Sequence, residues 1–487
     1  DVEEDYVFNI GLTPNRADAM SHMGVARDLK ALFSFNKIGF KWSYPEITKL
    51  KFVKNNNSIP VDIQEPELVD AYHGISISNV TVKESPVWLK NRLKSIAVTP
   101  KNNIVDITNY ILHEIGQPLH AFDSKKINKG IIVKKIKKQK KFKTLDGIER
   151  ELDQNDLMIC DHKKPLCIAG VIGGEESAVG NKTKDIFLES ACFNAISVRK
   201  SAKKFGLNTD ASFRFERGVD PEIGIYAIKR AAIFIQELAG GDLGQITSFK
   251  NEKDKKEVIL KFNYINKLVG QKIEKKQIIQ ILTSLDMTVD KIGQDVIKVN
   301  IPRYRVDVNR PADLIEEILR IYGYDNIKMP KKFNSNSYDY ESNKIYNFNN
   351  NISQVLVNHG FYETINNSIS SPKNNDLISE SNAVKIINPM GVEFSELRNS
   401  LIPSCLEAIK FNSNRQSKIL KTFEFGKIYK PIKDDFKESK LLSISLTGNV
   451  FEDNWNVKKQ PDNFFYFKGI IEMMLSNKIN KWEEKFV

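Results

Sequence analysis

The chain lacks long hydrophobic runs and any paired arrangement of cysteines. No apolar run approaches the roughly 20 residues that a membrane-spanning helix needs, so we expect a soluble globular protein with no membrane partner. The cysteines, which show neither CxxC pairing nor metal-ligand spacing, are Cys160, Cys167, Cys192 and Cys405. This pattern excludes a disulfide framework and a zinc finger. It indicates buried thiols in a reducing compartment, and we expect a cytoplasmic protein.

Two features of nucleotide-binding enzymes are also missing. The glycine-rich stretch AGVIGGEESAV at 169–179 lacks the GxxxxGK pattern of a phosphate-binding loop. Arginine is scarce beyond residue 331, where only Arg398 and Arg415 occur. Guanidinium groups suit phosphate binding because they donate two parallel hydrogen bonds, so with so few arginines we expect no convincing ATP clamp in this part of the chain.

What the chain does have is length and positive charge. Its 487 residues allow about three domains of roughly 100 to 200 residues each. The formal net charge of +12 suits a polyanionic partner such as RNA, because Lys and Arg release counterions from phosphates. The abundance of Lys, Asn and Ile is equally typical of an AT-biased genome, so both interpretations of the charge stay open.

Hydrophobic periodicity predicts a multidomain α+β chain. The first segment combines a strand through Tyr6, Phe8 and Ile10 with a helix. The predicted segments are an α+β segment at 1–45, a strand-rich region with intervening helices at 60–240, a small α+β module at 250–330, and an antiparallel sheet flanked by helices at 335–487.

Several short motifs contain candidate site residues. His120 follows a Gly-Gln-Pro turn in GQPLHAFD, and Glu189 interrupts the apolar strand of DIFLESACF. Gly173 would let the backbone approach a ligand closely. In NTDASFRFERGVDP, Thr209 offers a hydroxyl and Ala211 keeps a wall small. Residue chemistry alone leaves structural alternatives open, namely a structural histidine, an outward-facing strand glutamate and a loop held by ion pairs.

Four carboxylates gather in RVDVNRPADLIEEILRIYGYDNI. Asp313, Glu316 and Glu317 stand at i, i+3 and i+4, so they share one helical face, and Asp307 precedes them on an extended approach. Hard oxygen ligands of this kind favour Mg²⁺. The alternative is helix-start electrostatics, because Pro311 is typical of a first helical position and acidic residues there are stabilised by the helix dipole.

Six motifs occur in one order along nearly the whole chain. They are TPNRADAMSHMGVARDL, GQPLHAFD, GVIGGEESAV, LESACF, TDASFRFERGVDP and RVDVNRPADLIEEILRIYGYDNI. Together they resemble the bacterial-type phenylalanyl-tRNA synthetase beta subunit. The resemblance implies a fragment without the family's N-terminal tRNA-binding module and C-terminal anticodon-binding domain. The implied domains are a B3/B4-type editing domain at 60–240, a B5-type helix-turn-helix-like module at 250–330, and a class II synthetase-like domain that has lost its chemistry at 335–487.

The resemblance also implies a function. The chain is expected to support ATP-dependent attachment of phenylalanine to tRNA(Phe) by an alpha subunit in an alpha2beta2 heterotetramer, with ATP and phenylalanine at the alpha-subunit site. It is also expected to hydrolyse mischarged Tyr-tRNA(Phe). The residues that fall on the family's editing pocket are His120, Gly173, Glu189, Thr209 and Ala211. We expect Glu189 to recognise the tyrosine hydroxyl or the substrate amine, Thr209 and Ala211 to shape the pocket, and His120 to position the water or the terminal ribose.

By the same resemblance, the carboxylates fall one by one on the family's Mg²⁺ ligands, which implies a structural or assembly-related metal; they are Asp307, Asp313, Glu316 and Glu317. Two rival functions remain. A free-standing trans-editing hydrolase would act on aminoacyl-tRNA without an alpha subunit. A nucleic-acid-binding scaffold would use residues 250–330, but the acidic start of LIEEILRIYGY disfavours it.

Overall fold

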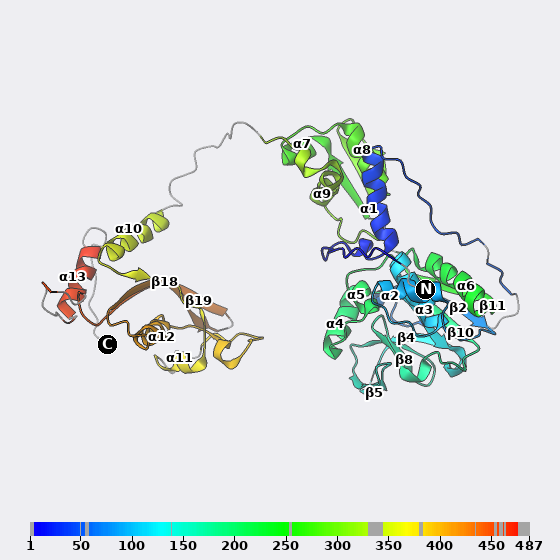
Figure 1. Cartoon of the computed structure of the whole chain (residues 1–487), viewed down its shortest axis with the longest axis horizontal. Coiled ribbons are helices and arrows are strands. Elements are labelled where there is room, and N and C mark those ends of the chain that lie inside the picture. The colour runs from blue at the N-terminus through cyan, green and yellow to red at the C-terminus, as the bar shows by residue number, and fades with distance from the viewer. Residues whose placement is uncertain are drawn as a thin grey trace. The chain divides into compact units, whose positions relative to one another are not determined.

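The computed structural model divides into two compact units, an N-terminal unit (Asp1–Lys331) and a C-terminal unit (Lys332–Val487), both seen in Figure 1. The residues described are 4–48, 50–53, 58–137, 139–252, 256–329, 344–378, 383–433, 435–451, 455–456, 461 and 464–475.

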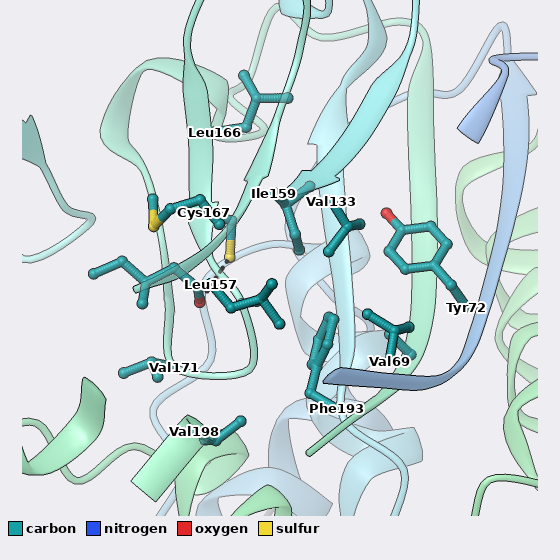
Figure 2. Packing of buried hydrophobic residues seen from close by; sticks show 14 of the residues in the cluster. Val69, Tyr72, Val133, Leu157, Ile159, Leu166, Cys167, Val171, Phe193 and Val198 are labelled. Carbon is teal, nitrogen blue, oxygen red and sulfur yellow. Dashed lines mark hydrogen bonds between the residues drawn. The ribbon is translucent and has the colours of Figure 1, made fainter. Parts of the chain in front are cut away.

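The N-terminal unit is built on two sheets that pack face to face. The first has the strand order β11-β2-β10-β3, formed by Asp242–Lys250, Val69–Ser78, Ile186–Phe193 and Leu119–Asp123. The second has the order β1-β4-β7-β8-β9, formed by Val61–Ile63, Ile131–Lys135, Leu157–Cys160, Pro165–Ile168 and Ile172–Gly173. A buried apolar cluster lies between them, and Figure 2 shows part of it. Every position of strand β10 is buried, and its sequence is accordingly a nearly continuous run of apolar residues.

Helices cover the other face of the first sheet. A second apolar cluster joins strands β2 and β10 to helices α2 (Val87–Ser95), α3 (Asn103–Ile115) and α6 (Gly224–Ala239). Helix α3 is capped at its N-terminus by Asn102, whose side chain accepts hydrogen bonds from two backbone N–H groups, and at its C-terminus by Gly116 with a φ of 90°. The other helices and strands here are α4 (Ala195–Phe205), α5 (Asp210–Phe215) and the hairpin β5–β6 (Lys140–Lys143, Glu149–Leu152), which turns at Asp146-Gly147.

A smaller module completes the N-terminal unit. Its sheet has the order β12-β14-β13, formed by Lys256–Lys261, Val296–Ile301 and Thr288–Lys291. Its helices are α7 (Phe262–Val269), α8 (Lys275–Ser284) and α9 (Pro311–Tyr322). Ala31 of helix α1 (His22–Phe35) is buried in the core of this module, so the N-terminal helix packs as part of it.

The strand predicted near the start of the chain is wrong. Tyr6, Phe8 and Ile10 lie in irregular backbone and are all exposed. An alternating pattern forms a strand only where a partner strand supplies backbone hydrogen bonds, and no strand within the described ranges pairs with this stretch.

The C-terminal unit centres on a long hairpin. Strand β18 (Leu420–Ile432) pairs antiparallel with β19 (Asp435–Thr447), while the short β15 (Tyr362–Glu363) pairs parallel with β18. The sheet predicted here as antiparallel is therefore mixed. The other elements are β16 (Ile369–Ser370), β17 (Glu396–Leu397), α10 (Lys344–Asn358), α11 (Pro372–Asp376), α12 (Ile402–Ser413) and α13 (Phe464–Leu475).

The prediction of a multidomain α+β chain is confirmed, because helices and sheets occur in both units. Within the described ranges, we find no helix long and apolar enough to cross a bilayer.

Candidate active site and carboxylate cluster

Three neighbouring strands place three polar side chains on one face of the first sheet. Glu189 on β10 stands opposite His120 on β3, and two residues further along β10, Ala191 stands opposite Tyr72 on β2. Residues opposite each other in an antiparallel pair share a face, as do residues two apart on one strand. Glu189, His120 and Tyr72 therefore all point toward the second sheet.

Glu189 is a buried carboxyl group with one hydrogen-bond donor. It is 5% exposed, so the alternative of an outward-facing strand position is wrong. The hydroxyl of Tyr72, itself 0% exposed, donates to Oε2 of Glu189 at 3.1 Å. Burial raises the pKa of Glu189 to about 8, and the Tyr72 hydrogen bond opposes this rise only in part. At neutral pH the carboxyl group is mostly protonated, so it can donate as well as accept a hydrogen bond.

His120 presents an unused ring nitrogen at the same place. Its ring packs edge-on against Phe122, with centroids 4.4 Å apart. Its Nε2 atom is buried and has no hydrogen-bond partner among the described residues. Burial lowers the pKa of His120 to about 4, so the imidazole is neutral at pH 7. A buried polar atom without a partner costs free energy, which a ligand or water can recover by bonding to it.

Gly173 on β9 provides the space that His120 occupies. A Cβ atom at Gly173 would lie 2.6 Å from Cε1 and 2.9 Å from Nε2 of His120. Any larger residue would therefore push the imidazole away from its position. The structure thus brings Gly173, His120 and Glu189 into one site, which we call the carboxyl–imidazole site.

Ala211 lies on helix α5, and Thr209 immediately precedes this helix. Thr209 is the N-cap of this helix, since its Oγ1 accepts from the backbone N–H of Ser212 at 3.0 Å. The same hydroxyl donates to the backbone oxygen of Val171 at 2.7 Å, which ties α5 to the chain just before β9. Ala211 packs against the apolar cluster between the sheets. In the described part of the chain no hydrogen bond joins either residue to Glu189 or His120, so their place in the site stays a prediction.

Sequence reasoning missed two members of this neighbourhood. Tyr72 lies in a stretch that the pattern shows only as a strand, and its role depends on register, which the sequence does not reveal. Cys167 on β8 is buried, and its Sγ lies 3.3 Å from the backbone oxygens of Ile168 and Ile172. Burial and the nearby Glu189 raise the pKa of its thiol well above the usual value, so it stays a thiol.

Three of the four carboxylates predicted as metal ligands, Asp307, Asp313 and Glu317, lie in arginine ion pairs or a helix cap. Arg305, which is 2% exposed, donates to Glu317 at 2.6 Å and to both oxygens of Asp307 at 3.0 Å. Asp313 accepts from the backbone N–H of Arg310 at 2.8 Å, which is helix capping. Glu316 is exposed.

Arginine also sets the ionisation of Glu317. Burial alone would raise its pKa, but hydrogen bonds from Arg305 and Arg320 outweigh burial and lower the pKa to about 2. Arg320 additionally pairs with Asp28 of helix α1 at 2.9 Å, so the cluster links that helix to α9. Because Arg305 and Arg320 hold Glu317, and Arg305 also holds Asp307, the arrangement of these two carboxylates does not fit a cation. No group of three or more His, Cys, Asp or Glu within the described ranges could hold a metal ion. Magnesium binding stays a prediction from the resemblance.

We predict that Glu317→Gln lowers the free energy of unfolding of the chain by about 3 kcal/mol, because it leaves two arginines partly unpaired in a buried site. The adjacent, exposed Glu316→Gln is the matched control and should change it by less than about 0.5 kcal/mol. Urea unfolding in the presence of Mg²⁺ and in the presence of EDTA measures the free energy of unfolding of both variants. Equal effects of the two variants, or stabilisation of the wild type by Mg²⁺, would argue for a metal site instead.

We predict that Gly173→Ala destabilises the chain by about 1 to 3 kcal/mol, because the added methyl group overlaps the His120 ring. Gly180→Ala is the matched control, since a Cβ atom there meets nothing within 4 Å. Urea unfolding of both variants compares them. If the two variants had the same stability, His120 would not fill the space beside Gly173.

Three family models match successive parts of the chain. They are the B3/4 domain at residues 68–240, the tRNA synthetase B5 domain at residues 258–324, and the phenylalanyl tRNA synthetase beta chain CLM domain at residues 330–482. The carboxyl–imidazole site lies within the first match, and the four carboxylates lie within the second.

Individual relatives match nearly the whole chain. It is 39% identical over 490 residues to the phenylalanine–tRNA ligase beta subunit of Bacteroides fragilis strain YCH46, which covers 97% of this chain and 59% of that protein. It is 40% identical over 492 residues to the same subunit of Porphyromonas gingivalis, with 97% and 60% covered.

A solved N-terminal fragment of the phenylalanyl-tRNA synthetase beta subunit from Pyrococcus horikoshii is 18% identical. The match covers 64% of this chain and 85% of that fragment. Its TM-score is 0.33, which is too low to place any residue. The chain spans about 60% of the length of the curated relatives it matches. With 39% identity over 97% of its own length, the chain belongs to the family of phenylalanine–tRNA ligase beta subunits.

Proposed function

We propose that this chain acts in a phenylalanine–tRNA ligase as the subunit that removes tyrosine from mischarged Tyr-tRNA(Phe). The observation that carries the proposal is the carboxyl–imidazole site. There, the buried carboxyl group of Glu189 stands opposite His120, whose buried Nε2 has no partner among the described residues. A buried polar pair of this kind suits a ligand that brings its own hydroxyl group.

Glu189 would supply the selectivity of this site. A pocket built to hydrogen-bond a hydroxyl rejects the analogue lacking it strongly, because the pocket's own polar group is then left unpaired. Tyrosine differs from phenylalanine only by its phenol hydroxyl. With a pKa near 8, the carboxyl group of Glu189 can donate to that hydroxyl or accept from it at neutral pH.

His120 would act on the water. In the hydrolysis, the water oxygen attacks the ester carbonyl, the bond to the terminal ribose oxygen breaks, and the ribose oxygen takes up a proton. A neutral imidazole can accept a hydrogen bond from the attacking water through an unprotonated ring nitrogen. Thr209 and Ala211 would shape the wall through helix α5, whose position Thr209 fixes by its bond to Val171.

Aminoacylation would take place on an alpha subunit. Both arginines of the C-terminal unit have internal partners: Arg398 pairs with the buried Glu424 at 2.7 Å, and the guanidinium of Arg415 lies 3.4 Å from the ring centroid of Phe411. This supports the prediction that ATP and phenylalanine bind at the alpha-subunit site. Magnesium takes no part in the chemistry proposed for this chain.

Exposed apolar side chains support a partner for the C-terminal unit. Ile365, Ile387, Met390 and Trp455 are each more than 90% exposed. Large apolar side chains left in water are typical of surfaces that another subunit covers. We propose that the alpha subunit covers this surface within an alpha2beta2 assembly that binds tRNA(Phe).

We predict that Glu189→Ala, assembled with an alpha subunit, lowers the rate of Tyr-tRNA(Phe) deacylation at least about tenfold, because the hydroxyl of tyrosine loses its partner. Charging of tRNA(Phe) with phenylalanine should stay unchanged. Glu151→Ala, at an exposed position of β6, is the matched control. A Glu189→Ala assembly that clears Tyr-tRNA(Phe) at the wild-type rate would overturn the proposal, as would failure of the chain to bind an alpha subunit.

A further inference from the structure

The Tyr72 hydroxyl donates a hydrogen bond to the Glu189 carboxyl group. We propose that Tyr72 is a positioning residue that holds Oε2 of Glu189, so that Oε1 alone meets the phenol hydroxyl of the substrate. The inference deepens the proposed editing function and rests on it for the substrate. The contact itself is a property of the free chain.

The geometry of the contact supports this role. The Tyr72 hydroxyl lies 3.1 Å from Oε2 of Glu189, and both side chains are buried. Among the described residues, Tyr72 is the single hydrogen-bond donor to Glu189. A carboxyl group is planar, so fixing one oxygen fixes the direction of the other. The Tyr72 bond therefore aims Oε1.

Tyr72 is itself held firmly, which a positioning residue requires. Its backbone is paired on both sides, with Ala191 of β10 and with Phe249 of β11. Its ring lies in the apolar cluster that includes Val69 and Val133 (Figure 2). The packed neighbours and the strand pairing on both sides hold the ring in place, so it cannot shift with Glu189 if that side chain moves.

Among the described residues, no other group near Glu189 would stabilise its negative charge. The titratable side chains that face it are Tyr72 from β2, His120 from β3 and Cys167 from β8, and all three are neutral at pH 7. Without a cation, the Tyr72 hydroxyl is the one described group that favours the ionised form of Glu189. Its removal should therefore change both the direction and the titration of the carboxyl group.

The contact also supports a phenol as the ligand of Glu189. The chain's own phenol already shows that Glu189 accepts a tyrosine hydroxyl at ordinary hydrogen-bond distance. A substrate tyrosine would make the corresponding bond to Oε1, whereas a substrate phenylalanine would leave Oε1 unpaired. The Tyr72 hydroxyl thus sets selectivity without touching the reacting ester.

The test replaces only the hydroxyl. Tyr72→Phe keeps the ring, and Tyr226→Phe is the matched control, because the Tyr226 hydroxyl donates to the backbone oxygen of Pro45 at 2.6 Å, away from the site. The first measurement is an infrared titration of the Glu189 carboxyl band, with Glu189→Gln as the reference. We expect Tyr72→Phe to move the midpoint upward by roughly one pH unit and Tyr226→Phe to leave it unchanged. An unmoved midpoint in Tyr72→Phe would overturn the proposal.

The second measurement uses the assembly with the alpha subunit and compares deacylation of Tyr-tRNA(Phe) with that of Phe-tRNA(Phe). We expect Tyr72→Phe to lower kcat/KM for the tyrosyl substrate about tenfold, mainly through KM, and to leave the phenylalanyl substrate unchanged. Equal losses for both substrates would mean a structural role for Tyr72. If the wild-type assembly deacylated neither substrate, the proposed editing function would fail, while the titration would still decide whether Tyr72 positions Glu189.

Discussion

The pairing of β10 between β2 and β3 is the constraint on which the candidate site depends. It puts Tyr72, Glu189 and His120 on one face, and the second sheet then covers that face. An ionised carboxylate buried without a cation is too costly to persist, so the group takes up a proton instead. The strand register therefore determines the ionisation state of Glu189 and the hydrogen bonds open to a ligand.

Among the described residues of the N-terminal unit, two buried glutamates have opposite electrostatics. Glu189 has no cationic partner, and burial raises its pKa to about 8. Glu317 lies between Arg305 and Arg320, and its pKa falls to about 2. A carboxyl group near its own pKa can exchange hydrogen bonds with a ligand, whereas one locked between two guanidinium groups stabilises the fold. This contrast separates the proposed reacting site from the carboxylate cluster, although the sequence suggested ligands at both.

The sequence predicted the elements better than the contacts between them. Periodicity found β2, β10, α3 and α9, because each has one or two buried faces. It could not distinguish a buried strand from the exposed alternation at residues 6–10, since that depends on a distant partner. The bond from Tyr72 to Glu189 and the pair of Arg320 with Asp28 span 117 and 292 residues of chain, so spacing could not reveal them. Motif resemblance supplied His120 and Gly173, but only the fold shows that one fills the space beside the other.

Neither rival function gains support. The relatives that match are beta subunits of a ligase, which does not favour a free-standing trans-editing hydrolase.

The central claim is that Glu189 is buried and protonated near neutral pH, and the pH dependence of the free energy of unfolding tests it most directly. The pKa of Glu189 is near 8 in the folded protein and near 4.5 in the unfolded chain. The folded protein therefore holds this proton more tightly, and the free energy of unfolding falls as the pH rises from 4.5 to 8. From pH 5 to 8, the wild type should lose about 3 to 4 kcal/mol more than Glu189→Gln. Parallel curves for the two proteins would contradict the account.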